Sequence, residues 1–130
     1  MNEAAPEFHL SGIVIDCKDA RALGSFYRRL LGWTMISDDH GWFELQSPDG
    51  LLLNFQTTDA YEPPAWPSQT GKQGQMQHLD FYVKDLDAAV SYAKQLGARA
   101  ANKQFYESNG CIAMIDPEGH PFCVIRKNAS

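Results

Sequence analysis

Residues 77–85 read QHLDFYVKD and combine a strand pattern with the start of a helix. Polar and apolar residues alternate along most of this stretch, which is typical of a strand with one buried face. Asp85 closes it as a predicted N-cap, because its carboxylate accepts hydrogen bonds from the free N–H groups of a first helical turn. Residues 12–19, GIVIDCKD, show the same pattern and end at Asp19. The two stretches therefore predict two similar strand–helix units.

The similarity continues beyond these two stretches. The predicted N-caps are 66 residues apart, and the glycines that end the two helices, Gly32 and Gly97, are 65 apart. The turns SPDG at 47–50 and DPEG at 116–119 are 69 apart. Because the same features recur in the same order at nearly constant spacing, the sequence indicates an internal duplication.

Each half of the duplication reads as a strand, a helix and three further strands. Strands are expected at 10–17, 33–38, 42–47 and 51–57 in the first half, and at 78–84, 98–105, 110–115 and 121–126 in the second. The predicted fold class is α+β, with two βαβββ modules that form a curved, mostly antiparallel eight-stranded trough with the helices on its convex face. We expect residues 1–130 to be one domain, with module 1 at about 10–57 and module 2 at about 77–127.

The segment between the modules, residues 58–76, has no strand or helix pattern. It contains three prolines, two glycines and the aromatic residues Tyr61 and Trp66. Loops of this length inside a compact domain often have a function. Two interpretations remain open: a linker whose aromatic side chains fix it to the surface, and a lid whose aromatic side chains cover a pocket.

The strand alternation also predicts which side chains face the trough. Apolar residues face the helices, and the other face carries polar and aromatic residues, as expected for a ligand site. The predicted concave set is Gly12, Val14, Asp16, Trp42, Glu44, Gln46, Leu52, Asn54, Gln56, His78, Asp80, Tyr82, Cys123 and Ile125.

Composition excludes several classes of partner. The 130 residues have a formal net charge of −5 and no cluster of lysine and arginine, which argues against nucleic acid and anionic membranes as partners. No apolar run approaches the roughly 20 residues needed to span a bilayer, and the first residues do not read as a signal peptide. Three cysteines without CxxC spacing favour a reducing cytoplasm over a disulfide framework.

Several segments resemble the vicinal oxygen chelate superfamily, which contains glyoxalase I, extradiol dioxygenases, and bleomycin- or fosfomycin-resistance proteins. They are KDARALGSFYRRLLGW at 18–33, HLDFYVKDLDAAV at 78–90 and IDPEGHPFCVI at 115–125. The resemblance covers residues 10–127 and is strongest to the glyoxalase-like bacterial branch. It implies the paired βαβββ fold, but no particular reaction.

The resemblance also implies where a metal would be bound. The four ligand positions of metal-using members fall at Gly12, Asn54, His78 and Cys123, and only His78 is a conventional ligand for the family. Cys123 could bind zinc as a thiolate. We therefore expect no intact metal site and no cofactor. The alternative is a divalent ion (Zn, Ni, Fe or Mn) at a shifted site that uses Asp80 and Gln56, which lie two residues from His78 and Asn54 on the same faces.

No catalytic residue is assigned from the sequence. His78, Glu44 and Asp80 are candidates for general acid–base groups if they converge in the trough. A carboxylate near His78 would hold one tautomer of the imidazole. The same cluster would equally suit the binding of a polar ligand, so the candidates do not by themselves indicate an enzyme.

Two functional hypotheses follow. The first is a metal-free protein that binds a small, aromatic or apolar molecule in the trough, and the second is a metal-dependent lyase, isomerase or dioxygenase of the same superfamily. An interaction module is a weaker third. The predicted ligand-binding residues are Asn54, Gln56, His78, Asp80, Tyr82, Trp42, Trp66 and Cys123. The resemblance further implies a homodimer, in which the modules pair either within one chain or between two.

Overall fold

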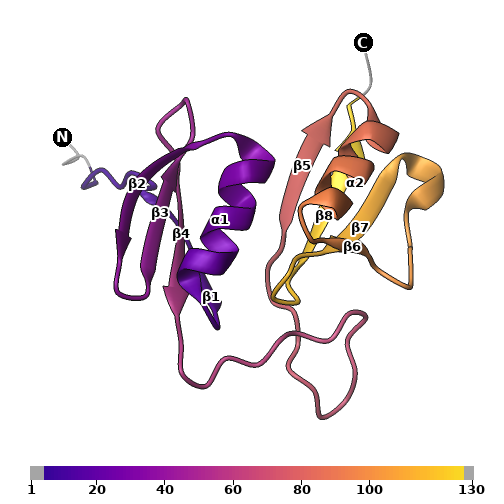
Figure 1. The fold of residues 1–130 in the computed structure, drawn as a ribbon, viewed down its shortest axis with the longest axis horizontal. Coiled ribbons are helices and arrows are strands. Elements are labelled where there is room, and N and C mark those ends of the chain that lie inside the picture. The colour runs from indigo at the N-terminus through magenta and orange to yellow at the C-terminus, as the bar shows by residue number, and fades with distance from the viewer. Residues whose placement is uncertain (1–4, 128–130) are drawn as a thin grey trace.

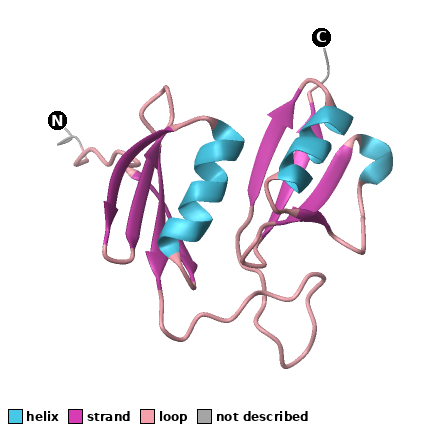
Figure 2. Cartoon of the chain, viewed as in Figure 1, coloured by secondary structure: helices cyan, strands magenta, loops and turns pink. Residues whose placement is uncertain are grey.

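Each half of the chain forms one four-stranded sheet with one α-helix packed on it (Figures 1 and 2). The computed structural model describes residues 5–127. Module 1 consists of β1 (Gly12–Cys17), α1 (Ala20–Leu31), β2 (Thr34–Asp39), β3 (Trp42–Gln46) and β4 (Leu52–Thr57). Module 2 consists of β5 (Leu79–Val83), α2 (Leu86–Gln95), β6 (Arg99–Ala100), the 3-10 turn η1 (Glu107–Asn109), β7 (Cys111–Ile115) and β8 (Pro121–Arg126).

The two sheets have equivalent topologies. The strand order is β1-β4-β3-β2 in module 1 and β5-β8-β7-β6 in module 2. In each sheet the first strand pairs with the last in parallel, and the other pairs are antiparallel. The predicted α+β fold of two βαβββ modules is therefore confirmed. The eight strands form two four-stranded sheets, and β1 and β5 are each at the edge of their own sheet.

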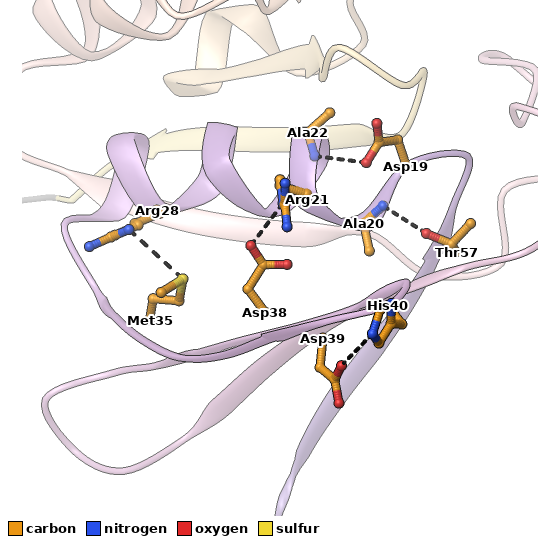
Figure 3. A network of polar contacts seen from close by, with 10 residues as sticks. All are labelled: Asp19, Ala20, Arg21, Ala22, Arg28, Met35, Asp38, Asp39, His40 and Thr57. Carbon is orange, nitrogen blue, oxygen red and sulfur yellow. Dashed lines mark hydrogen bonds and ion pairs between the residues drawn. The ribbon is translucent and has the colours of Figure 1, made fainter.

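The ends of α1 are fixed by the residues that the sequence indicated. Asp19 is the N-cap, and its carboxylate accepts a hydrogen bond of 3.1 Å from the Ala22 amide (Figure 3). The Ala20 amide donates to the Thr57 hydroxyl of β4 at 2.9 Å, which ties the start of the helix to the sheet. Gly32, with φ of 70°, ends the helix in the left-handed conformation that glycine adopts without strain. Asp85 caps α2 in the same way.

The two modules share one hydrophobic core. Phe122 of β8 lies 6.2 Å from Phe26 and 6.0 Å from Tyr27, measured between ring centroids, and both of these residues belong to α1. Phe122 also packs against Phe81 of β5 at 6.0 Å. Helix α1 thus contacts the sheet of module 2 as well as its own, as its position between the two modules in Figure 1 suggests. The opposite faces of both sheets are turned away from this core.

Polar contacts also join the modules at the turn between β7 and β8. The Glu118 carboxylate accepts hydrogen bonds from the Lys18 and Asp19 amides, at 2.6 and 2.9 Å. The Tyr27 hydroxyl donates to the buried Asp116 carboxylate at 2.8 Å. These bonds connect residues about 90 to 100 positions apart, so the turn 116–119 holds module 2 against the start and middle of α1.

The prediction of a long strand at 98–105 is wrong. Only Arg99 and Ala100 pair with β7. Beyond them the Gln104 side chain donates to the carbonyls of Ala101 and Ala113, both at 2.9 Å, and accepts from the Ala113 amide at 2.8 Å. The side-chain amide of Gln104 thus makes the hydrogen bonds at the edge of β7 that the backbone of a longer β6 would make. The chain therefore leaves the sheet early and forms η1.

The segment 58–76 is anchored on module 2. The Tyr61 hydroxyl donates to the Glu118 carbonyl at 2.8 Å. Pro63 packs so closely on Gly119 that a Cβ at Gly119 would lie 2.8 Å from the Pro63 Cβ. The Ala65 amide donates to the Gln73 carbonyl at 2.8 Å, which closes the segment into a loop. Within residues 5–127, neither α-helix has the length and apolar character needed to cross a bilayer.

Candidate functional site

Three potential ligand side chains lie together on the outward face of module 2. Strands β5 and β8 are parallel, with Asp80 opposite Cys123, and His78 directly precedes β5 on the same face. One donor atom each from His78, Asp80 and Cys123 lie within 4.8 Å of one another. The closest pair is His78 Nε2 and Asp80 Oδ1, at 3.1 Å. The concave face predicted from alternation therefore brings these three residues into contact distance.

Both ring nitrogens of His78 have partners. The Gln75 side-chain nitrogen lies 3.2 Å from Nδ1, and Asp80 lies next to Nε2. An amide N–H donates, so this arrangement requires Nδ1 to accept and Nε2–H to donate to the carboxylate. The imidazole is 34% exposed, and neither of its ring nitrogens is free. A metal at Nε2 would require the other tautomer and a rotated Gln75 amide.

The Cys123 side chain is a thiol rather than a thiolate at neutral pH. Burial raises its pKa to about 12, and the neighbouring Cys111 and Asp80 act in the same direction. A thiolate is the form that binds zinc and attacks electrophiles. Cys123 thus contributes a small, weakly polar surface to this face.

Trp66 of the linker packs on the same face. Its ring centroid is 6.3 Å from that of His78 and 6.0 Å from that of Phe105, the latter in an edge-to-face arrangement at 88°. The indole and Cys123 pack against a small buried cluster of Ala101, Ala113 and Ile115. The indole Nε1 is buried and has no hydrogen-bond partner among the described residues. Such a group typically costs about 1–3 kcal/mol.

The remaining linker aromatic, Tyr61, lies elsewhere. It bonds to the Glu118 carbonyl, and its ring lies 5.4 Å from that of His120. Burial raises the pKa of Tyr61 above its ordinary value. Tyr61 therefore anchors the linker, and of the two linker aromatics only Trp66 contacts the cluster at His78.

A second polar group occupies the outward face of module 1. The Trp42 indole donates to the Glu44 carboxylate at 2.6 Å, and Glu44 lies opposite Asn54 in the β3–β4 pair. Asn54 is 7% exposed, and its side-chain oxygen is buried without a partner among the described residues. Gln56 is exposed opposite Trp42. A buried amide oxygen without a partner is available to accept a hydrogen bond from a ligand.

Gly12 cannot be replaced by a metal ligand without moving the strand. A Cβ at this position would lie 2.4 Å from the Leu52 carbonyl oxygen of β4. Glycine therefore permits the close approach of β1 and β4. One of the four positions at which the superfamily places ligands is closed by this packing.

The structure separates the predicted site residues into two groups. His78, Asp80, Cys123 and Trp66 are together on module 2, whereas Trp42, Glu44, Asn54 and Gln56 are together on module 1. The two sheets share no strand pairing among the described residues. Tyr82, at 72% exposure, projects from β5.

Three contributors to the site were missed from the sequence. Gln75 and Phe105 lie in irregular segments, so no periodicity indicates their direction. Cys111 lies on β7, which pairs antiparallel to β8, and the register places it near Cys123. Alternation along 110–115 was the signal that could have identified Cys111.

Two clefts lie away from this cluster. One of about 440 Å³ lies between α2 and the segment from β6 to η1, and one of about 330 Å³ lies between the end of α1 and module 2. The second is lined mainly by apolar residues of α1, β5, α2 and β8. Neither is lined by His78, so the candidate site is the outward face itself.

Paired βαβββ modules with polar and aromatic residues on the outward sheet faces define a protein of the vicinal oxygen chelate superfamily. The model of the glyoxalase-like domain matches residues 12–125, and the chain belongs to this family. The resemblance noted from the sequence is thereby confirmed. A comparison with curated proteins found no match.

Solved structures share the fold at low sequence identity. A glyoxalase/bleomycin resistance protein/dioxygenase family enzyme from Burkholderia phytofirmans is 23% identical, with a TM-score of 0.69 over 90% of this chain and 97% of that one. A glyoxalase/dioxygenase from Nostoc punctiforme is 19% identical, with a TM-score of 0.67 over 98% and 99%. The fosfomycin resistance protein FosX from Listeria monocytogenes is 16% identical, with a TM-score of 0.68 over 95% and 97%.

Proposed function

We propose that this protein binds a small planar aromatic or apolar molecule on its outward sheet faces, without a metal ion. The observation that carries the proposal is the surface around Trp66, where aromatic rings lie beside polar groups that are already paired. Aromatic side chains favour flat apolar ligands through burial and stacking. Paired polar groups such as His78 with Asp80 fix the orientation of a ligand that binds beside them.

The residues at the superfamily's ligand positions do not suit a metal. Gly12 has no side chain and no room for one, and Asn54 offers an amide oxygen from the other sheet. His78 has both ring nitrogens engaged. No catalytic step through a metal follows from these donors.

A binding screen tests the proposal. The chelator-treated protein is titrated with a panel of planar mono- and bicyclic aromatic compounds, followed by calorimetry. We expect saturable binding of at least one compound, weakened about tenfold or more by His78→Ala, because the imidazole is part of the binding surface. His40→Ala is the matched control, since the His40 side chain is 99% exposed on a turn of module 1. Absence of binding across the panel would refute the proposal.

A metal-dependent lyase, isomerase or dioxygenase is the second candidate. It is favoured by one observation, the convergence of His78, Asp80 and Cys123 within 4.8 Å. These donor types suit zinc, and to different degrees nickel, iron and manganese. Elemental analysis after loading with each ion separates the two candidates. One tightly held ion per chain, lost in His78→Ala and retained in His40→Ala, would favour the second.

We further propose that the protein is a homodimer in which the modules pair between chains. Within one chain the two groups of site residues lie on separate sheets, and among the described residues the edge strands β1 and β5 each pair with a strand on one side only. Val14 on β1 and Tyr82 on β5 are 47% and 72% exposed. A second copy that places its β1 beside β5 would cover both and unite the groups.

Light scattering at several protein concentrations tests this arrangement. We expect a mass of twice 14.5 kDa, and a shift toward monomer in Val14→Lys, because a charge on the unpaired edge opposes strand association. A wild-type protein that remains monomeric at high concentration would exclude a shared site.

The proposal includes a reducing compartment such as the cytoplasm. All three cysteines are free, and Cys17 is buried with its pKa raised to about 12. Free thiols of this kind persist where disulfide formation is disfavoured. Their number in purified protein can be checked by thiol titration, with three expected.

A further inference from the structure

The Trp66 indole occupies the part of module 2 where a ligand of the proposed function would bind. It packs against the buried cluster of Ala101, Ala113 and Ile115, and the rings of His78 and Phe105 lie 6.3 and 6.0 Å from the indole. The indole therefore lies on a small apolar cluster with two rings near it. A flat ring therefore fits there, and in the described structure this ring is the Trp66 indole of the protein itself.

The indole belongs to a loop rather than to the sheet it covers. Residues before it are fixed by Tyr61 at the Glu118 carbonyl and by Pro63 against Gly119. The chain after Trp66 turns back, and the hydrogen bond from the Ala65 amide to the Gln73 carbonyl closes the loop. The loop can therefore release its tip at Trp66 while both of its anchors on module 2 stay in place.

The polar atom of the indole is not satisfied in this position. Its Nε1 is buried and has no hydrogen-bond partner among residues 5–127. A buried donor without an acceptor disfavours the docked state relative to a state in which water solvates it. The rings on this face thus hold Trp66 by apolar packing alone, and a better-matched flat molecule can compete with it.

We propose that Trp66 occupies the ligand subsite of module 2 itself, and that the ligand is a planar bicyclic aromatic of about indole size that displaces it. The inference rests on the proposed function and adds the ligand class and an internal competitor. It differs from a lid that covers a bound ligand, because a lid adds contacts to the complex whereas a competitor lowers the apparent affinity.

Affinity measurements separate the two roles of Trp66. The dissociation constant of 2-naphthol is measured by calorimetry for the wild type, Trp66→Ala and the control Tyr106→Ala. Tyr106 is a 65% exposed aromatic on the same module. If the docked indole is populated about tenfold over the free one, the wild-type dissociation constant is raised about tenfold. We expect Trp66→Ala to bind about tenfold more tightly, and Tyr106→Ala to match the wild type.

A second measurement follows the Trp66 side chain of the wild type, because tighter binding by Trp66→Ala can also arise from the cavity that the substitution creates. The protein is labelled with 5-fluorotryptophan, and the Trp66 resonance is assigned with Trp66→Phe. Displacement predicts that 2-naphthol increases the solvent isotope shift of this resonance between H₂O and D₂O, because the indole moves into water. The resonance of Trp33, which packs against the hydrophobic core, serves as the internal reference.

The outcomes distinguish this inference from the proposed function. Weaker binding by Trp66→Ala, with a Trp66 resonance that becomes more shielded from solvent, overturns displacement and leaves ligand binding intact. Failure of 2-naphthol to bind either the wild type or Trp66→Ala also overturns the inference. The proposed function is then decided by the wider panel of planar compounds.

Discussion

Asp116 is a buried carboxylate at the junction of the two modules. It is 4% exposed, and burial raises its pKa above the ordinary value, although His120, Tyr27 and two backbone N–H groups act in the opposite direction. The structural consequence is that the charged form is tolerated through hydrogen bonds from Tyr27 and the turn amides. Through the Tyr27–Asp116 hydrogen bond and those of Glu118, the turn 116–119 links module 2 to α1.

The raised pKa predicts a specific pH dependence of stability. A carboxyl whose pKa is higher in the folded state stabilises the fold most below its unfolded value, near 4, and loses that contribution as the pH rises through the folded value. Asp116→Asn should therefore lose more stability relative to the wild type at pH 4 than at pH 7. Urea unfolding at both pH values measures it. An equal difference at the two pH values would contradict the raised pKa.

Gly12 is constrained by the neighbouring strand. Because a Cβ would lie 2.4 Å from the Leu52 carbonyl oxygen, Gly12→Ala should reduce the free energy of unfolding by about 1–3 kcal/mol. Gly74→Ala is the control, since a Cβ there meets no atom within 4 Å and its φ is not in the left-handed range. Chemical denaturation compares the two variants. Equal stability of both would show that β1 can move away from β4.

At the scale of elements, the Gln104 side chain makes hydrogen bonds to β7 that the backbone of a longer β6 would otherwise make. Its amide makes three hydrogen bonds to the backbone of Ala101 and Ala113. Gln104→Leu should cost about 1–3 kcal/mol, because it leaves buried backbone groups without partners. Gln95→Leu at the exposed end of α2 is the matched control. Hydrogen exchange should accelerate at the Ala113 amide in Gln104→Leu, and unchanged exchange there would refute this role.

Most helices and strands could be predicted from the sequence, because helix caps and the alternation of strand residues depend on residues that are close together in the chain. Asp19 and Asp85 cap their helices, and alternation correctly divided β1, β4, β5 and β8 into inward and outward faces. The prediction of a strand at 98–105 is wrong because the Gln104 side chain, and not the backbone of its segment, hydrogen-bonds to the Ala113 amide of β7. Residue patterns alone cannot distinguish these two uses of an amide.

Prediction of the candidate site was limited by long-range geometry. Periodicity identified His78, Asp80 and Cys123 as sharing a face, and the structure brings their donor atoms together. The partners Gln75 and Phe105 come from irregular segments, whose paths depend on anchors such as Tyr61 and Pro63. The placement of the module 1 group on a separate sheet depends on the shared core around Phe122, which no local pattern encodes.

For the whole molecule, the packing of α1 between the modules determines which sheet faces of one chain are available to a ligand. The helix-side faces are used for the shared core, so the faces with site chemistry are left outward and separate. Each face combines aromatic rings with polar side chains. This combination leads to the central claim that the protein binds an organic molecule without a metal.

The most direct test is one calorimetric titration performed under two conditions. The aromatic compound that binds best is titrated into protein treated with chelator, and into the same protein loaded with a stoichiometric divalent ion. We expect the same dissociation constant and stoichiometry in both. Binding that occurs only after loading with the ion, and that is lost again when chelator is added, would contradict metal-free binding.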